Sequence, residues 1–88
     1  MVDHVAWENL GPYMIAYRRE RSPGRKTDVW DVVNRNSDVV LARVEWHCPW
    51  RRYVLIPIAE DTIWAADCLR LIADFIERQM AARKRGQD

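Results

Sequence analysis

The chain has 88 residues, a length at which we expect one domain with a small core. Its formal net charge of +1 provides no overall field toward nucleic acid or membrane, and 31% charged with 49% hydrophobic residues is typical of a folded chain rather than a disordered one. No apolar run approaches the roughly 20 residues that a membrane helix needs. Two cysteines, Cys48 and Cys68, make no disulfide framework, and no secretory leader precedes the rest, so we expect a cytoplasmic protein without membrane contact.

The first segment, residues 1–12, has no clear period and ends at Gly11-Pro12, a strong signal for a turn. We interpret it as an N-terminal arm that precedes a single ββββα domain at residues 13–85. Val5, Trp7 and Leu10 are apolar enough for the arm to dock onto the domain.

Four segments rich in β-branched and aromatic residues follow, at 13–19, 26–34, 39–47 and 50–57. Turn signals separate them: Ser22-Pro23-Gly24, the polar stretch 34–38, and Cys48-Pro49. We therefore predict four strands that pair in sequence order as an antiparallel meander.

After Pro57 the apolar residues recur with a period of 3.6, which predicts an amphipathic helix over about residues 65–84. The expected apolar stripe consists of Cys68, Leu69, Ile72, Phe75, Ile76 and Met80. The expected fold class is α+β: a four-stranded antiparallel meander sheet packed on one C-terminal amphipathic helix.

A two-residue hairpin tip at Cys48-Pro49 would set the register of the last two strands. Trp46 would then oppose Arg51, Val44 would oppose Tyr53, Ala42 would oppose Leu55, and Glu45 would oppose Arg52. The other register would bury Glu45 and Arg52, so we reject it. Pairing the two middle strands across residues 34–38 likewise places Trp30 opposite Ala42 and Val32 opposite Val40. The helix should cover Trp30, Val32, Val44, Trp46, Tyr53 and Leu55.

The other face of the predicted sheet is also partly apolar. It carries Val29, Val33, Leu41, Trp50, Val54 and Ile56 around Arg43, Glu45, His47 and Arg52. One helix covers only one side of a sheet, and large exposed apolar patches usually mark interaction sites. We predict a partner-binding surface made of Trp50, Arg52, Arg43, His47, Leu41 and Val54, with Trp50 as its anchor, because Trp and Arg dominate binding hot spots. The arm or a second copy of the chain could instead cover this face.

Candidate chemistry in the sequence is sparse. His47-Cys48 lacks the four ligands at characteristic spacings that a zinc site needs, and Cys68 fits a small core residue. No phosphate loop or nucleophile motif is present. We therefore predict no catalytic residues, no metal, no cofactor and no enzyme activity.

A nucleic-acid-binding module is the alternative prediction, because basic residues lie close to tryptophans along the chain. It would use Arg18, Arg19, Arg25, Lys26, Arg51 and Arg52. Asp31 and Glu45 weigh against it, since carboxylates on the face of Trp50 would repel phosphates. A homodimer through the second face is a third interpretation.

Spaced motifs across residues 26–77 resemble a family of small uncharacterised proteins of bacterial, archaeal and phage genomes. They are KTxxWxV from Lys26, LxxVxW from Leu41, WRxY from Trp50 and CLxxIxxFI from Cys68. The resemblance implies the fold and no activity. The small size, the absence of catalytic groups and the apolar second face favour a non-enzymatic protein-binding module, and the genomic setting of the family adds, by analogy, that a phage or prophage encodes it. Its sharpest version is an inhibitor of a host defence complex, such as an anti-CRISPR protein.

Overall fold

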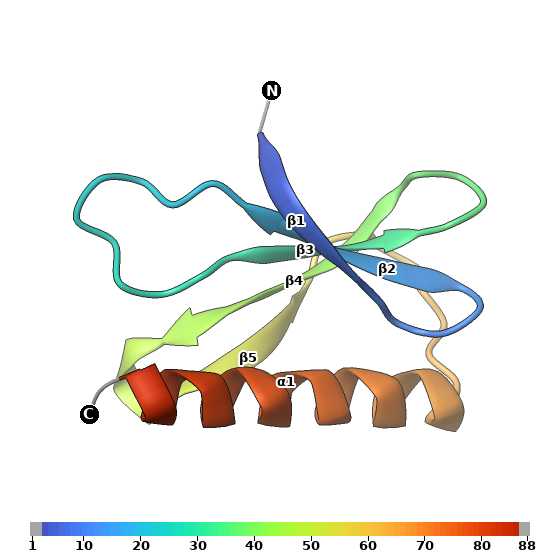
Figure 1. Ribbon diagram of the computed structural model, residues 1–88. Coiled ribbons are helices and arrows are strands. Elements are labelled where there is room, and N and C mark those ends of the chain that lie inside the picture. The colour runs from blue at the N-terminus through green and yellow to red at the C-terminus, as the bar shows by residue number, and fades with distance from the viewer. Residues whose placement is uncertain (1–2, 87–88) are drawn as a thin grey trace.

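The computed structural model describes residues 3–86, in which a five-stranded antiparallel sheet packs on one long helix (Figure 1). The strands are β1 (His4–Asn9), β2 (Met14–Arg19), β3 (Trp30–Asn34), β4 (Val40–His47) and β5 (Arg52–Pro57), and the helix is α1 (Ala66–Gly86). Each strand pairs with the next one in the chain. The predicted α+β class, with an antiparallel sheet and a C-terminal helix, is confirmed.

The predicted number of strands is wrong, because the segment interpreted as an arm contains β1. This strand pairs antiparallel with β2, with Trp7 opposite Tyr17 and Asn9 opposite Ile15. None of its side chains is fully buried, and Trp7 is 64% exposed. Its apolar residues, Val5 to Trp7, are consecutive, so the sequence carried no alternation to predict a strand. Leu10, directly after β1, is buried in the core. Residues 1 and 2 of the predicted arm lie outside the described residues.

Helix α1 presents its apolar stripe to the sheet. Phe75 and Ile72 are buried, and the Phe75 ring packs edge-on against Trp30 with ring centroids 5.0 Å apart. Cys68, Ile76 and Met80 are partly buried against the same core. Leu69 is 48% exposed, so its assignment to the stripe is wrong; it lies at the margin of the apolar face.

The turns explain where the predicted register fails. The chain between β4 and β5 has a 3₁₀ turn at Cys48–Trp50, followed by Arg51 in the left-handed region with φ 52°. This connection is longer than the predicted two-residue tip, so Trp46 opposes Tyr53 rather than Arg51, and His47 opposes Arg52. Trp30 likewise opposes Val44 rather than Ala42. A shift of two positions keeps each side chain on its predicted face, since side chains alternate with period two.

Leu41 is an exception to the predicted faces. Val32 opposes Ala42 while Val33 opposes Val40, so Leu41 is an extra residue at a β-bulge. Its side chain packs against the core, and its carbonyl accepts the backbone N–H groups of Ile58 and Ala59 at 3.0 and 3.1 Å. Leu41 therefore packs on the helix side, away from the other residues predicted for the partner-binding surface.

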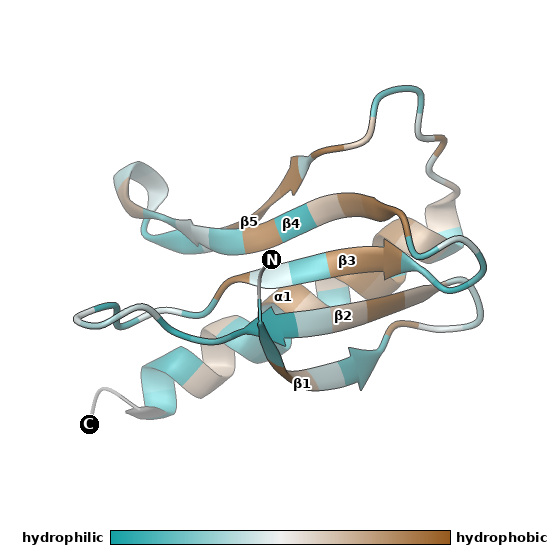
Figure 2. Cartoon of the chain, turned by 90° about the horizontal axis from the view of Figure 1, so that it is seen from above, coloured by the Kyte–Doolittle hydropathy of each residue, from teal (hydrophilic) through white to brown (hydrophobic). Residues whose placement is uncertain are grey.

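The core lies between the sheet and α1. Figure 2 shows strongly apolar segments in β3 and β4, two of the strands that supply it. Its buried members are Leu10, Met14, Ala16, Trp30, Val32, Ala42, Val44, Tyr53, Ile72 and Phe75. The opposite side of the sheet has no covering layer within residues 3–86 (Figure 1).

Candidate functional site

The open face is the side of the sheet directed away from α1. By register and alternation it carries side chains from all strands: His4, Trp7, Tyr17, Arg19, Asp31, Val33, Arg43, Glu45, His47, Arg52, Val54 and Ile56. Charged groups occupy its centre, and aromatic and apolar groups surround them.

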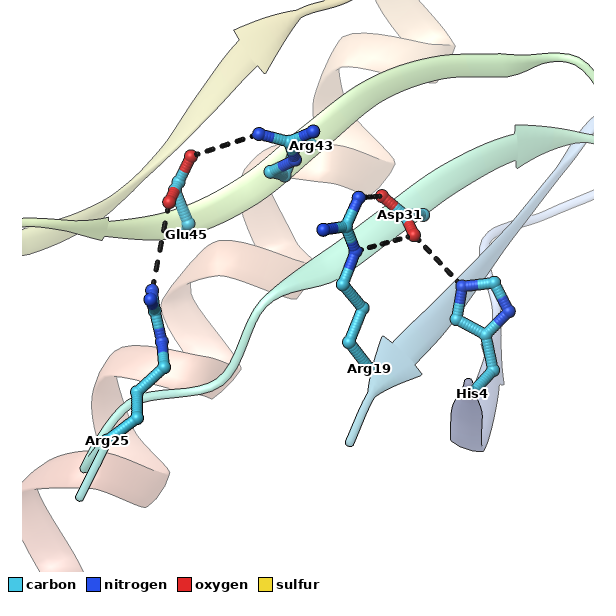
Figure 3. Close-up of polar contacts among 6 residues, drawn as sticks. All are labelled: His4, Arg19, Arg25, Asp31, Arg43 and Glu45. Atoms are coloured by element: carbon cyan, nitrogen blue, oxygen red, sulfur yellow. Dashed lines mark hydrogen bonds and ion pairs between the residues drawn. The ribbon is translucent and has the colours of Figure 1, made fainter. Parts of the chain in front are cut away.

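Asp31 is the central group of this face and is only 3% exposed. Arg19 donates from Nε and Nη2 to its two carboxylate oxygens, at 2.9 Å each, and His4 Nε2 donates to Oδ2 at 2.9 Å (Figure 3). Burial by itself would raise the pKa of Asp31, but the hydrogen bonds from Arg19 and His4 outweigh it and hold that pKa below its ordinary value. Hydrogen bonding to Asp31 in turn raises the pKa of Arg19.

A second ion group lies beside the first, because Arg43 opposes Asp31 on the neighbouring strand. Glu45 forms an ion pair on each side: Arg43 Nη1 is 3.7 Å from one carboxylate oxygen and Arg25 Nη2 is 3.7 Å from the other (Figure 3). Carboxylates therefore compensate most of the positive charge at the centre of the open face.

The hairpin end of this face gathers three of the predicted partner-binding residues. His47 packs edge-on against Trp50 with ring centroids 4.9 Å apart, and Arg52 Nε donates to the Trp50 carbonyl at 3.3 Å. Trp50 itself is 64% exposed. Val54 is half-buried on β5, the strand of Arg52, and Arg43 lies on β4 at the centre of the face.

The far edge of the open face is aromatic too. Trp7 on β1 is exposed to the same extent as Trp50, and His4 stacks on Tyr17 with ring centroids 5.2 Å apart. The face thus has an exposed tryptophan at each end of its charged centre.

The structure does not bring the six residues predicted for nucleic acid onto one surface. Arg19 and Arg52 lie on the open face, whereas Arg18 points to the helix side and lies 4.0 Å from Asp28. Arg25 and Lys26 lie in the loop between β2 and β3, and Arg51 lies in the turn before β5.

The network of His4, Arg19 and Asp31 is the feature that sequence reasoning missed. The usable signal was the position of Asp31 inside an apolar strand, because a carboxylate buried there needs a charged partner. Nothing in the sequence indicated His4, since it is 27 residues away and its strand was not predicted.

The described residues offer little for other chemistry. In the range 3–86, no three His, Cys, Asp or Glu side chains gather where they could hold a metal ion. Cys48 and Cys68 are both free thiols. No helix within those residues has the length and apolar character to cross a membrane.

Fold and open face together define a small α+β protein in which one helix covers one side of an antiparallel sheet and nothing within residues 3–86 covers the other. No family profile matches the chain, and no solved structure matches it. An uncharacterised 9.3 kDa protein of Acholeplasma phage L2 is 31% identical to it over 62 residues, which are 70% of this chain and 78% of the phage protein. The chain belongs to the same family as this phage protein.

Proposed function

We propose that this chain is a small non-enzymatic protein-binding module, encoded by a phage or prophage, that inhibits a host defence complex in the manner of an anti-CRISPR protein. The observation that carries the proposal is the open face, a sheet surface with a compensated charged centre and exposed tryptophans at both ends. Kinship with a phage protein supports the phage or prophage origin.

Charge balance favours a protein as the occupant of this face. Arg19 is held by the carboxylate of Asp31, and Arg43 shares Glu45 with Arg25. A polynucleotide on this surface would have to displace carboxylates from their arginines, because its phosphates compete for the same donors. A protein partner can instead add its own polar groups around pairs that are already formed.

Trp50 is the proposed anchor of the contact. Its ring is large, exposed, and held on one side by His47, so little conformational entropy is lost when a partner covers it. Arg52, which donates to the Trp50 carbonyl, and Arg43 supply polar contacts beside it. Removal of such an anchor typically weakens binding by about 2 kcal/mol or more.

The test measures defence inhibition and capture in the same cells. Bacteria with an active CRISPR system express the affinity-tagged chain, and plaque formation by a targeted phage is counted. Wild type should restore plaques and copurify with the defence complex, whereas Trp50→Ala should lose both by tenfold or more. Ile63→Ala is the matched control, since Ile63 is 94% exposed but lies outside the sheet.

Other outcomes separate the parts of the proposal. If Trp50→Ala restored as many plaques as wild type, Trp50 would not be the anchor. Failure of the wild type against every defence system tried would remove the inhibitor role. A mass that doubles with concentration, and reverts to monomer in Trp50→Ala, would show instead that a second copy of the chain occupies the open face.

A further inference from the structure

A second surface lies on the helix side of the molecule, where the loop between β2 and β3 meets the last turns of α1. The two segments enclose a cleft of about 670 Å³. Four cations, Arg21, Arg25, Lys26 and Arg83, line it together with one carboxylate, Asp28. The volume falls within the roughly 300–1,000 Å³ of ligand pockets in general.

An adjoining cleft of about 690 Å³ shares Arg83 with the first. Trp46, Cys48, Met80 and Ala81 make most of its lining apolar, and Arg51 and Lys84 add charge at its margin. The guanidinium of Arg83 lies over the ring of Trp46, 4.1 Å from its centroid. A cationic cleft and an apolar, aromatic cleft are thus joined at one arginine.

Structural roles account for only part of this charge. Arg21 Nε donates to Asp28 at 2.7 Å, and this hydrogen bond raises the pKa of Arg21. Basic residues in the last turn of a helix also compensate the helix dipole. Within residues 3–86, however, neither Lys26 nor Arg83 has a carboxylate within ion-pair distance, although they line the same cleft. The positive charges of Lys26 and Arg83 therefore repel each other across the cleft, and an anion bound between them would relieve this repulsion.

Tyr53 adds a neutral donor to the same place. Its ring is buried beside Trp46, and its hydroxyl accepts the backbone N–H of Asp28 at 3.2 Å. The hydroxyl keeps its own hydrogen for donation, and Tyr53 lines the cationic cleft. A phosphate oxygen is an acceptor that suits both this donor and the guanidinium groups around it.

We propose that the two clefts form a binding site for single-stranded nucleic acid, with a phosphate between Lys26 and Arg83 and a neighbouring base against Trp46 and Met80. Separate charged and aromatic clefts match the alternation of phosphate and base along such a strand. A duplex fits less well, because its bases are stacked away from the protein. The site lies on the opposite side of the sheet from the open face, so it goes beyond the proposed function.

The test measures fluorescence anisotropy of labelled 12-nucleotide single-stranded DNA and RNA, with a DNA duplex of the same length, over a range of salt concentrations. We expect at least one single strand to bind at low salt at least fivefold more tightly than the duplex. Lys26→Ala/Arg83→Ala should weaken that binding at least tenfold. It should also make the slope of log K against log salt shallower by about 0.7, since each phosphate neutralised on a single strand contributes about 0.7 and the two side chains share one phosphate.

The matched control is Arg70→Ala/Arg85→Ala, which also removes two positive charges, here from two positions of α1 that line neither cleft. It should weaken binding less than threefold. Lys26→Glu tests the site without touching the helix, because Lys26 is an exposed loop residue, and it should weaken binding at least fivefold. Urea unfolding of each variant verifies that the fold is retained.

Three results would overturn the assignment. One is the absence of binding to any oligonucleotide at low salt. Another is an equal loss of affinity in the two double variants, which would indicate a general effect of net charge. The last is equal binding of an acidic peptide or heparin, which would show a polyanion surface without preference for nucleic acid. None of these results bears on the open face, so the two proposals fail separately.

Discussion

Asp31→Asn is expected to destabilise the protein by about 2–3 kcal/mol at pH 7. The carboxylate accepts two hydrogen bonds from Arg19 and one from His4, and hydrogen bonds to charged groups are each worth about 1.5–3 kcal/mol. The asparagine amide would keep one acceptor oxygen and would place a donor against donors. Arg19 would lose its partner, but its side chain is 26% exposed, so water limits the cost below the roughly 3–5 kcal/mol of a fully buried broken pair.

The pH dependence identifies the mechanism. Because the pKa of Asp31 is lowered in the folded protein, its contribution is fully present above the ordinary carboxyl pKa of about 4 and is lost as the pH falls through the folded value. The difference in free energy of unfolding between wild type and Asp31→Asn should therefore be constant near neutrality and shrink below about pH 4.

Urea unfolding followed by tryptophan fluorescence, at pH 7 and at pH 3, measures both quantities. Glu45→Gln is the matched control, because Glu45 is on the same face but its contacts to Arg25 and Arg43 are 3.7 Å long and partly exposed. It should cost less than about 1 kcal/mol. A cost below about 0.5 kcal/mol for Asp31→Asn, or a difference that does not change with pH, would refute the reasoning.

Other predictions concern packing and backbone conformation, each measured as a change in the urea midpoint at constant slope. Phe75→Ala should cost about 3–5 kcal/mol, whereas Leu69→Ala, at an exposed position of the same helix, should cost less than about 1; equal costs would contradict the assigned core. Gly24→Ala should cost about 1 kcal/mol, because the φ of Gly24 is +83°. Gly11→Ala should cost more, because the φ of Gly11 is +85° and the added Cβ would lie 2.6 Å from the side chain of Leu71 on α1. Arg51→Gly should stabilise the protein by about 0.5–1 kcal/mol by relieving the left-handed conformation, and a loss of stability would show that the arginine side chain matters more.

Local signals in the sequence predicted the elements that depend on local physics. The helix followed from a period of 3.6 and was placed within two residues of its bounds at each end. The turn at Ser22-Pro23-Gly24 forms as expected: Arg25 N–H donates to the Ser22 carbonyl at 3.0 Å, and Gly24 takes the positive φ that this turn needs. The alternation of β5, and of β4 from Ala42 onward, sorted the side chains to the correct faces even where the register was displaced by two positions.

Pairing and proximity were decided only by the tertiary structure. β1 joins the sheet through backbone hydrogen bonds to β2, which need no pattern of side chains. The length of the turn after His47 set the register, and a bulge turned Leu41 toward the core.

The candidate sites depend on the same long-range choices. His4 reaches Asp31 because β1 was added to the sheet, and Lys26 shares a cleft with Arg83 because α1 ends beside the loop before β3. A sequence records which side chains alternate along a strand or a helix, since that depends on neighbours a few residues apart. Which strands and loops become neighbours depends on the free energy of the whole packed chain, so both candidate surfaces emerged only from the fold.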